Sequence, residues 1–166
     1  MECPEHELGL MPIDRLPRVP ERILDRVTVF ADPRLNRGTV LIGPFLVLVG
    51  FFVPFVSATG VAAAEISASA LEVAIDGADN LWLTPGAALA ILWVVWRRPT
   101  RSALRAARAA VFGLAVGGSV PLFYTTRRIA LVADGLAAIV EWHWGLWLML
   151  AGLLLVALGA PRLGKG

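Results

Sequence analysis

The sequence predicts an all-α integral membrane protein with four transmembrane helices, and composition and segment length support this fold class. Hydrophobic residues make up 57% of the chain, charged residues make up 17%, and the mean hydropathy is +0.71. Soluble domains are about half apolar and about a quarter charged. A helix needs roughly 20 apolar residues to cross a bilayer. Four segments without Asp, Glu, Lys or Arg approach that length: residues 39–57, 81–96, 109–126 and 142–160.

The residues ahead of the first apolar segment, 1–38, are expected to form a cytoplasmic arm. Pro20 suits the first turn of a helix, and the pattern after it predicts an amphipathic helix over about residues 20–31. Ile23, Val27 and Phe30 would form its apolar face. This face is suited to the inner leaflet, to the protein's own cytoplasmic end, or to docking of a partner.

The placement of charge predicts the orientation of the chain, because basic connections are retained in the cytoplasm. Residues 58–80 hold acids and no base, whereas the connection after residue 96 is rich in arginine and holds no acid. Both ends, including the tail 161–166, should therefore be cytoplasmic, although Arg127 and Arg128 oppose the rule. The arginines expected to fix topology and attract anionic lipid headgroups are Arg97, Arg98, Arg101, Arg105 and Arg108. Nucleic-acid binding is not expected, since this basic segment is short and tethered at a membrane surface.

The triplet LWL occurs twice, at residues 81–83 and 146–148, each time at the start of an apolar segment. GFFVPF from Gly50 and GGSVPL from Gly117 form a second matched pair. These matches predict two tandem helical hairpins, although common residues at membrane boundaries would give the same matches by chance. Indole rings favour the headgroup depth. The tryptophans expected to form this interface belt are Trp82, Trp142, Trp144 and Trp147.

Each outer loop is predicted to contain a short amphipathic helix. Leu71, Ala74, Ile75 and Ala78 have helical spacing in the first loop, although alternation at Ile66, Ala68 and Ala70 leaves a strand open. In the second loop the apolar stripe is formed by Ile129, Val132, Leu136 and Ile139. Pro54 and Pro121 are expected to end or bend the helices beside them.

Three small residues at four-residue spacing, Ala109, Gly113 and Gly117, predict a helix-packing face in the third apolar segment. Small residues allow two helices to approach closely in lipid. Two partners fit such a face: another segment of the same chain, which is the favoured interpretation, or a separate subunit.

Asp134, Glu141 and His143 form the one cluster with catalytic or metal-binding potential; a solvated polar rim is the expected interpretation, and a weak site for a divalent metal ion is the alternative. No catalytic, cofactor-binding or metal-binding residue is predicted. The sequence contains no Walker loop, GxSxG or HExxH motif. The chain is therefore predicted not to be an enzyme.

VPFVS at residues 53–57 and GLWL at residues 145–148 carry a resemblance that extends over about residues 40–160. The chain resembles small four-span bacterial membrane proteins of unassigned function, in which Pro-aromatic-x-Ser closes the first span and Gly-x-Trp-Leu opens the last. Phe55 stands where such proteins often have tryptophan. The resemblance implies a fold and a location in the bacterial inner membrane, and it assigns no functional residue.

The function expected from these features is that of a non-catalytic accessory or structural subunit of a larger bacterial membrane protein complex. Its partners would be other integral membrane subunits and anionic lipids. The alternative is a small oligomeric channel or carrier. Ion-coupled transporters place ionisable groups inside the membrane, and the four apolar segments contain none, which disfavours transport by a single chain.

Overall fold

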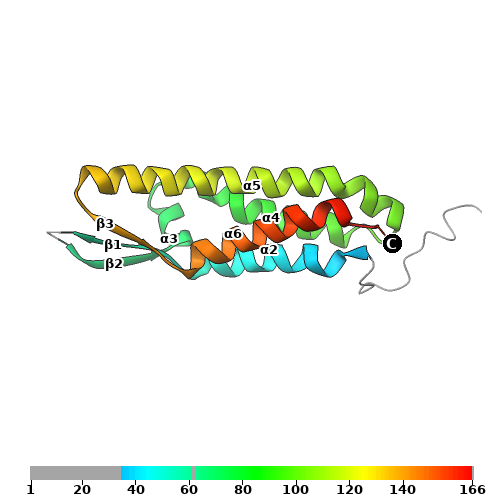
Figure 1. Ribbon diagram of the computed structural model, residues 1–166, viewed down its shortest axis with the longest axis horizontal. Helices are drawn as coiled ribbons and strands as arrows, with labels where there is room; N and C mark the ends of the chain where they lie inside the picture. The colour runs from blue at the N-terminus through cyan, green and yellow to red at the C-terminus, as the bar shows by residue number, and fades with distance from the viewer. Residues whose placement is uncertain (1–34, 61–62, 166) are drawn as a thin grey trace, which may run out of the picture.

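The computed structural model describes residues 35–60 and 63–165, which form a four-helix bundle with a small sheet at one end (Figure 1). The predicted arm residues Ile23, Val27 and Phe30 lie outside the described residues. The elements are, in chain order, α2 (Arg37–Phe52), β1 (Pro54–Gly60), β2 (Ala63–Ser69), α3 (Ala70–Ile75), η3 (Asp79–Trp82), α4 (Leu83–Trp96), α5 (Arg101–Gly135), β3 (Ile139–Trp142), α6 (Trp144–Gly159) and η4 (Ala160–Arg162).

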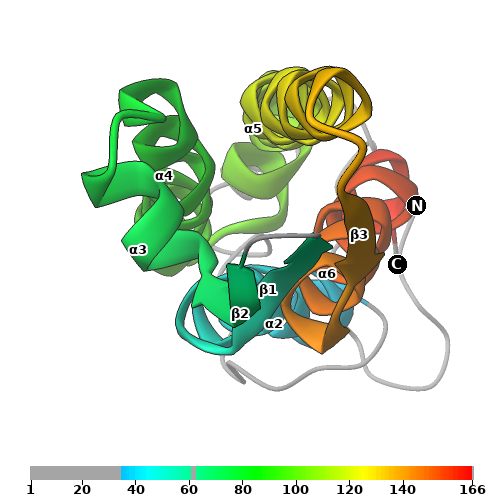
Figure 2. The same ribbon diagram turned by 90° about the vertical axis from the view of Figure 1, so that its left-hand side faces the viewer.

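The four long helices form a ring in which α2 packs most extensively on α6 and α4 packs on α5. Contacts between α2 and α4 and between α5 and α6 close the ring. Helix α5 runs the length of the molecule and continues beyond the bundle, over the sheet (Figure 1). The view along the bundle shows the sheet and α3 closing one end (Figure 2). We call this end the sheet end and the opposite end, where α5 begins, the basic end.

The prediction of four transmembrane helices is wrong. Only α5, with 35 residues, and the helical segment Trp144–Arg162, with 19 residues, are long and apolar enough to cross a membrane among the described residues. Helix α2 has 16 residues and α4 has 14. At 1.5 Å per residue these helices span roughly 24 and 21 Å, less than the ~30 Å hydrocarbon layer. Two helices therefore permit membrane association, and four spans are not formed.

The prediction of an all-α fold is also wrong, because the outer loops contribute an antiparallel sheet with the strand order β2-β1-β3. Ser57 in the central strand pairs with Ser67 of β2 and with Glu141 of β3. The helical pattern of the first loop forms α3, where the capping box of Ser69 and Glu72 ends the strand and begins the helix. The alternating pattern of this loop thus corresponds to β2, and the helical pattern that follows it corresponds to α3.

The second loop differs from its predicted form because α5 continues through Pro121 to Gly135. Pro54 marks the change from α2 to β1, as expected, whereas Pro121 lies within α5 and does not end it. The Pro121 ring is buried, so packing holds the helix where one backbone hydrogen bond is missing. The two Val-Pro segments therefore have different structures, so the two predicted hairpins do not share the same structure where their first helices meet the outer loops.

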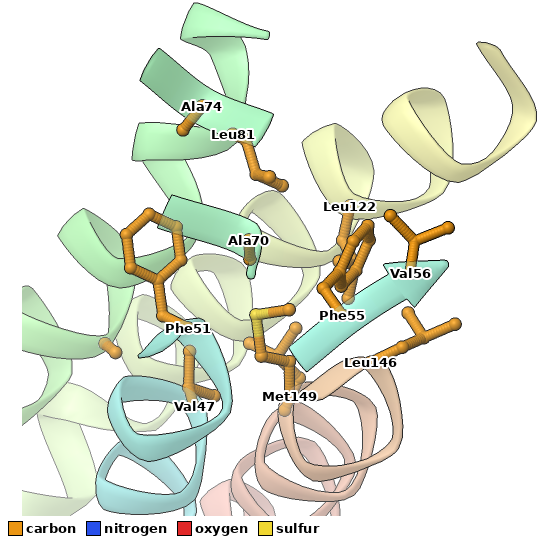
Figure 3. Close-up of a cluster of buried hydrophobic side chains, with 12 residues drawn as sticks. Val47, Phe51, Phe55, Val56, Ala70, Ala74, Leu81, Leu122, Leu146 and Met149 are labelled. Atoms are coloured by element: carbon orange, nitrogen blue, oxygen red, sulfur yellow. The ribbon is translucent and has the colours of Figure 1, made fainter. Parts of the chain in front are cut away.

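The buried side chains form two apolar clusters, one toward each end of the bundle. The cluster at the sheet end is shown in Figure 3, where Phe51, Phe55 and Met149 lie between α2, β1 and α6. At the basic end, Val40, Ile91 and Leu104 are fully buried in the second cluster. The sheet is thus packed onto the bundle through a shared core.

Glycines bring the backbones of α2 and α6 together. Gly43 and Gly50 on α2 face Gly152 and Gly145 on α6. A Cβ atom built on Gly43 would lie 2.5 Å from the carbonyl oxygen of Gly152, and one on Gly50 would lie 2.8 Å from that of Gly145. Seven residues separate the glycines on each helix, which places them on nearly the same side two turns apart. No side chain fits between the helices at these positions.

Candidate functional site

The small-residue face of α5 points away from the rest of the molecule. Ala109, Gly113 and Gly117 are all exposed. A Cβ atom added to Gly113 or Gly117 would meet nothing within 4 Å. The neighbouring Gly118, one position along the helix, is buried, and its added Cβ would lie 2.9 Å from the Cβ of Ala87. Helix α5 therefore packs on α4 through Gly118, and the stripe of Ala109, Gly113 and Gly117 stays exposed on the described part of the chain.

This placement bears on the two partners that fit the stripe. The favoured interpretation, a contact with another segment of the same chain, is not supported by the open surroundings of Gly113 and Gly117. The stripe is bordered by exposed apolar side chains, including Phe112 and Val120, which are 46% and 61% exposed. We refer to Ala109, Gly113, Gly117 and these two flanking residues as the α5 outer face. It is a narrow, shallow surface on which another helix can lie close to the backbone.

Apolar side chains also cover the outward faces of the other helices. Phe45 on α2 is 59% exposed, Leu89 on α4 is 56% exposed, and Leu158 on α6 is 64% exposed. Soluble monomers rarely expose contiguous apolar patches larger than a few hundred Å². The outward surface of the bundle is thus apolar on every side that the four helices present.

Tryptophans lie at both ends of this apolar surface. Of the predicted belt, Trp82, Trp144 and Trp147 are exposed at the sheet end, while Trp142 is half-buried against Phe55. The sequence-based belt missed a second group at the far end of α4, where Trp93 and Trp96 are 60% and 70% exposed. Trp93 and Trp96 stand at the opposite end of the apolar segment 81–96 from Trp82, and this placement was the sequence signal that could have predicted a second belt. Indole rings are enriched where an apolar layer meets headgroups.

The predicted topology arginines lie together at the basic end, and they also make contacts within the chain. Arg105 Nε donates to the Gly164 carbonyl at 3.0 Å, and Arg108 Nε donates to the Leu163 carbonyl at 2.7 Å. Arg98 Nη1 donates to the Ala103 carbonyl at 2.9 Å, and the Arg97 guanidinium lies 4.4 Å from the ring centre of Trp93. Arg105 and Arg108 therefore fix the C-terminal segment to α5, and the group as a whole concentrates positive charge at this end.

Arg37 is a buried charge at this end, with 2% of its surface exposed. Its Nη2 atom donates to the carbonyl of Val95 at 3.0 Å and also to the carbonyl of Arg98. Val95 lies in the last turn of α4 and Arg98 just beyond its end, where a cation is favoured by the helix dipole. Burial lowers the pKa of Arg37, but a guanidinium keeps its proton at physiological pH. Arg37 is a site residue that sequence reasoning missed.

At the sheet end, His143 joins β1 to the start of α6. Its Nε2 atom is 2.8 Å from the hydroxyl oxygen of Ser57, and its backbone N–H donates to the Phe55 carbonyl at 3.0 Å. A serine paired with a histidine is the arrangement of an activated nucleophile. Ser57 is 2% exposed, and its contact with His143 connects β1 to the start of α6. The pair is a structural link, and no local sequence signal predicts it because 86 positions separate the two residues.

Asp134, Glu141 and His143 do not converge. Glu141 lies on β3 and is exposed, and Asp134 is exposed near the end of α5. Within residues 35–60 and 63–165, no group of three His, Cys, Asp or Glu side chains could hold a metal ion. The nearby Glu72 accepts hydrogen bonds from the Ser69 backbone N–H at 2.6 Å and from the Ser69 hydroxyl at 2.9 Å, which lower the pKa of Glu72. Its role is to begin α3.

No protein-family model matches the chain, and no significantly similar curated protein or solved structure is found. A function for the chain must therefore be argued from its own geometry.

Proposed function

We propose that the protein is a non-catalytic accessory subunit of a membrane protein complex, and that its α5 outer face binds a transmembrane helix of another subunit. The observation that carries this proposal is the exposure of Gly113 and Gly117 on the longest apolar helix. Association of helices in lipid depends on close van der Waals packing, which bare backbone permits. An exposed stripe of this kind on a membrane-length helix is best explained by a partner.

We further propose that α5 and α6 cross the bacterial inner membrane, with α2 and α4 packed alongside them. The basic end, which holds Arg97, Arg98 and Lys165, would face the cytoplasm. The sheet end, with Glu72, Asp76 and Asp134, would face outward. The apolar surface of the bundle and the tryptophans at both of its ends support a position across the membrane, and the charges at the two ends support this direction.

Labelling of single cysteines tests the orientation. Cys3 is the only native cysteine, so Cys3→Ser provides the background. Asp76→Cys and Ser102→Cys introduce thiols at exposed positions on the sheet end and the basic end. A membrane-impermeant maleimide should label Asp76→Cys in intact cells and Ser102→Cys only after lysis. The reverse pattern would invert the proposed orientation, and labelling of both in intact cells would exclude an inner-membrane location.

Co-purification tests the partner. The tagged protein is extracted in mild detergent, with Gly113→Leu as the test variant and Gly86→Leu as its matched control. Gly86 is also an exposed helical glycine with nothing within 4 Å of its added Cβ, but it lies on α4. Membrane proteins that accompany the unaltered chain should be retained by Gly86→Leu and lost from Gly113→Leu. Equal recovery with both variants would rule out the α5 outer face as the docking surface.

The alternative of an oligomeric channel has less support, because the small polar side chains near the α5 outer face and the α4–α5 contact bond to backbone carbonyls of this chain. Ser119 Oγ donates to the Val116 carbonyl at 2.7 Å, and Thr84 Oγ1 donates to the Gly118 carbonyl at 2.9 Å. A pore formed around α5 would therefore be lined mainly by apolar side chains. Purification of only a homo-oligomer, disrupted by Gly113→Leu and accompanied by ion flux in liposomes, would favour the channel.

A further inference from the structure

A cavity of about 380 Å³ lies at the sheet end, between the sheet, the loop after α3 and the last turns of α5. Its volume is within the range of roughly 300–1,000 Å³ that is typical of small-molecule sites. Val56, Ala58 and Ala68 of the sheet form one wall, and Ile129 and Val132 of α5 form the opposite wall. The cavity is therefore lined mainly by aliphatic side chains.

Thr125 is a polar residue in this apolar wall. It is 2% exposed, and its hydroxyl has no hydrogen-bond partner in the described chain. A buried hydroxyl without a partner is destabilising, and nearby hydroxyls on α5 avoid this. Thr126 Oγ1, for example, donates to the Phe123 carbonyl at 2.9 Å. The Thr125 side chain lines a cavity in which a ligand could supply the missing hydrogen bond.

Arg128 adds a positive charge to the same part of the wall. It is exposed and lines the cavity three residues after Thr125, so the two side chains project from neighbouring positions on one helix face. Asp76 lies in the loop after α3 and places a negative charge on the other side of the rim. An anionic group is thus favoured beside α5, where a guanidinium and a hydroxyl can hold carboxylate or phosphate oxygens.

From this arrangement we infer that the cavity binds one alkyl chain of an anionic amphiphile, with the headgroup between Thr125 and Arg128 and the chain along the aliphatic walls. The ligand chemistry is a single acyl chain that carries a carboxylate or a phosphate, from a free fatty acid or from a membrane lipid. This site is separate from the α5 outer face and does not depend on binding of a partner helix there.

The experiment uses palmitate that carries a photoactivatable diazirine, added to the full-length protein in phosphatidylcholine vesicles. After irradiation, the label should map to residues 125–140 and to β1. Unlabelled palmitate and lysophosphatidylglycerol serve as competitors, and the stronger of the two identifies the free acid or the phospholipid as the ligand. Methyl palmitate has the same chain without the charge, so it should compete at least about ten-fold more weakly.

Three variants and one control separate the parts of the proposal. Ala58→Leu fills the cavity and should reduce labelling about ten-fold or more. Arg128→Gln should reduce it about ten-fold, whereas Arg127→Gln, the adjacent exposed arginine that does not line this cavity, should leave it unchanged. Thr125→Val keeps the shape of the side chain and should reduce labelling about three-fold.

Label spread evenly over the apolar faces of α5 and α6, or equal labelling of the Arg128→Gln and Arg127→Gln variants, would overturn the proposal. Equal competition by methyl palmitate would do the same. Because Arg128 and Arg127 are both exposed, their comparison remains valid even if Ala58→Leu fails to fold.

Discussion

The α2–α6 interface and the α5 outer face both present glycines in line along a helix, yet they have opposite surroundings. Between α2 and α6, a Cβ atom on Gly43 or Gly50 would collide with a carbonyl oxygen of the facing helix. On α5, a Cβ atom on Gly113 or Gly117 would meet nothing within 4 Å. Evenly spaced glycines thus indicate that a helix can be approached closely, and the rest of the fold decides whether the approaching helix belongs to the same chain.

The two regions also differ in the spacing of their glycines. Seven-residue spacing on α2 and α6 repeats every two turns and keeps the contact line along both helices. Four-residue spacing on α5 places the small residues on successive turns, where they make one short, bare segment. A long contact line suits a permanent intrachain interface. A short bare segment suits a single crossing point with another helix.

The largest expected effect is that of Gly152→Leu in α6. Its side chain would occupy the space of the Gly43 carbonyl and of Val47, so α2 and α6 would have to separate along their whole contact. We expect a loss of more than about 4 kcal/mol in the free energy of unfolding, a size that is exceptional for one substitution. The yield of folded protein and the thermal unfolding midpoint in detergent would measure this loss.

The control for this variant is Gly38→Leu at the start of α2, where an added Cβ meets nothing within 4 Å. It makes the same chemical change on the same pair of helices and should change the unfolding free energy by less than about 1 kcal/mol. If Gly152→Leu were as stable as Gly38→Leu, the backbone contact between α2 and α6 would not exist in the protein.

The four apolar segments of the sequence overlap the four long helices. Their bounds agree within two residues for α4 and α6, whereas α2 ends earlier and α5 extends further at both ends than predicted. A helix buried in lipid and a helix buried in a protein core need the same apolar side chains. Apolar runs therefore predict helices, but they do not distinguish a membrane span from a shorter packed helix. The third strand was missed because its pairing is non-local: Ser57 on β1 lies opposite Glu141 on β3. The β1–β2 hairpin is local, and the alternation at Ile66 and Ala68 had left a strand open there. The capping box at Ser69 and Glu72 was a local signal for the end of β2 that could have been used.

The candidate site was predictable to a similar degree. The small-residue pattern predicts a packing face at Ala109, Gly113 and Gly117, which stays a prediction, and the pattern does not contain the direction in which that face points. The direction of the stripe depends on which side of α5 is buried against the bundle, and contacts such as Gly118 against Ala87 determine that side. The cavity beside Thr125 could not be predicted, since its walls come from the sheet, the loop after α3 and the end of α5.

The smallest expected effect is the change in stability when one methyl group is added to either side of α5. Gly113→Ala adds a methyl group in open space, so it should stabilise the helix by up to about 1 kcal/mol through the greater helix propensity of alanine. Gly118→Ala would place its methyl group 2.9 Å from the Cβ of Ala87, so it should destabilise the bundle by about 1–2 kcal/mol. Thermal unfolding of the purified chain in one detergent, without partner proteins, compares the two variants directly. Opposite signs are expected because one glycine is exposed and the other is buried against α4. Destabilisation by both variants would mean that the α5 outer face is packed against this chain after all, and the case for an external partner would fail. Stabilisation by both would mean that Gly118 is not packed on α4.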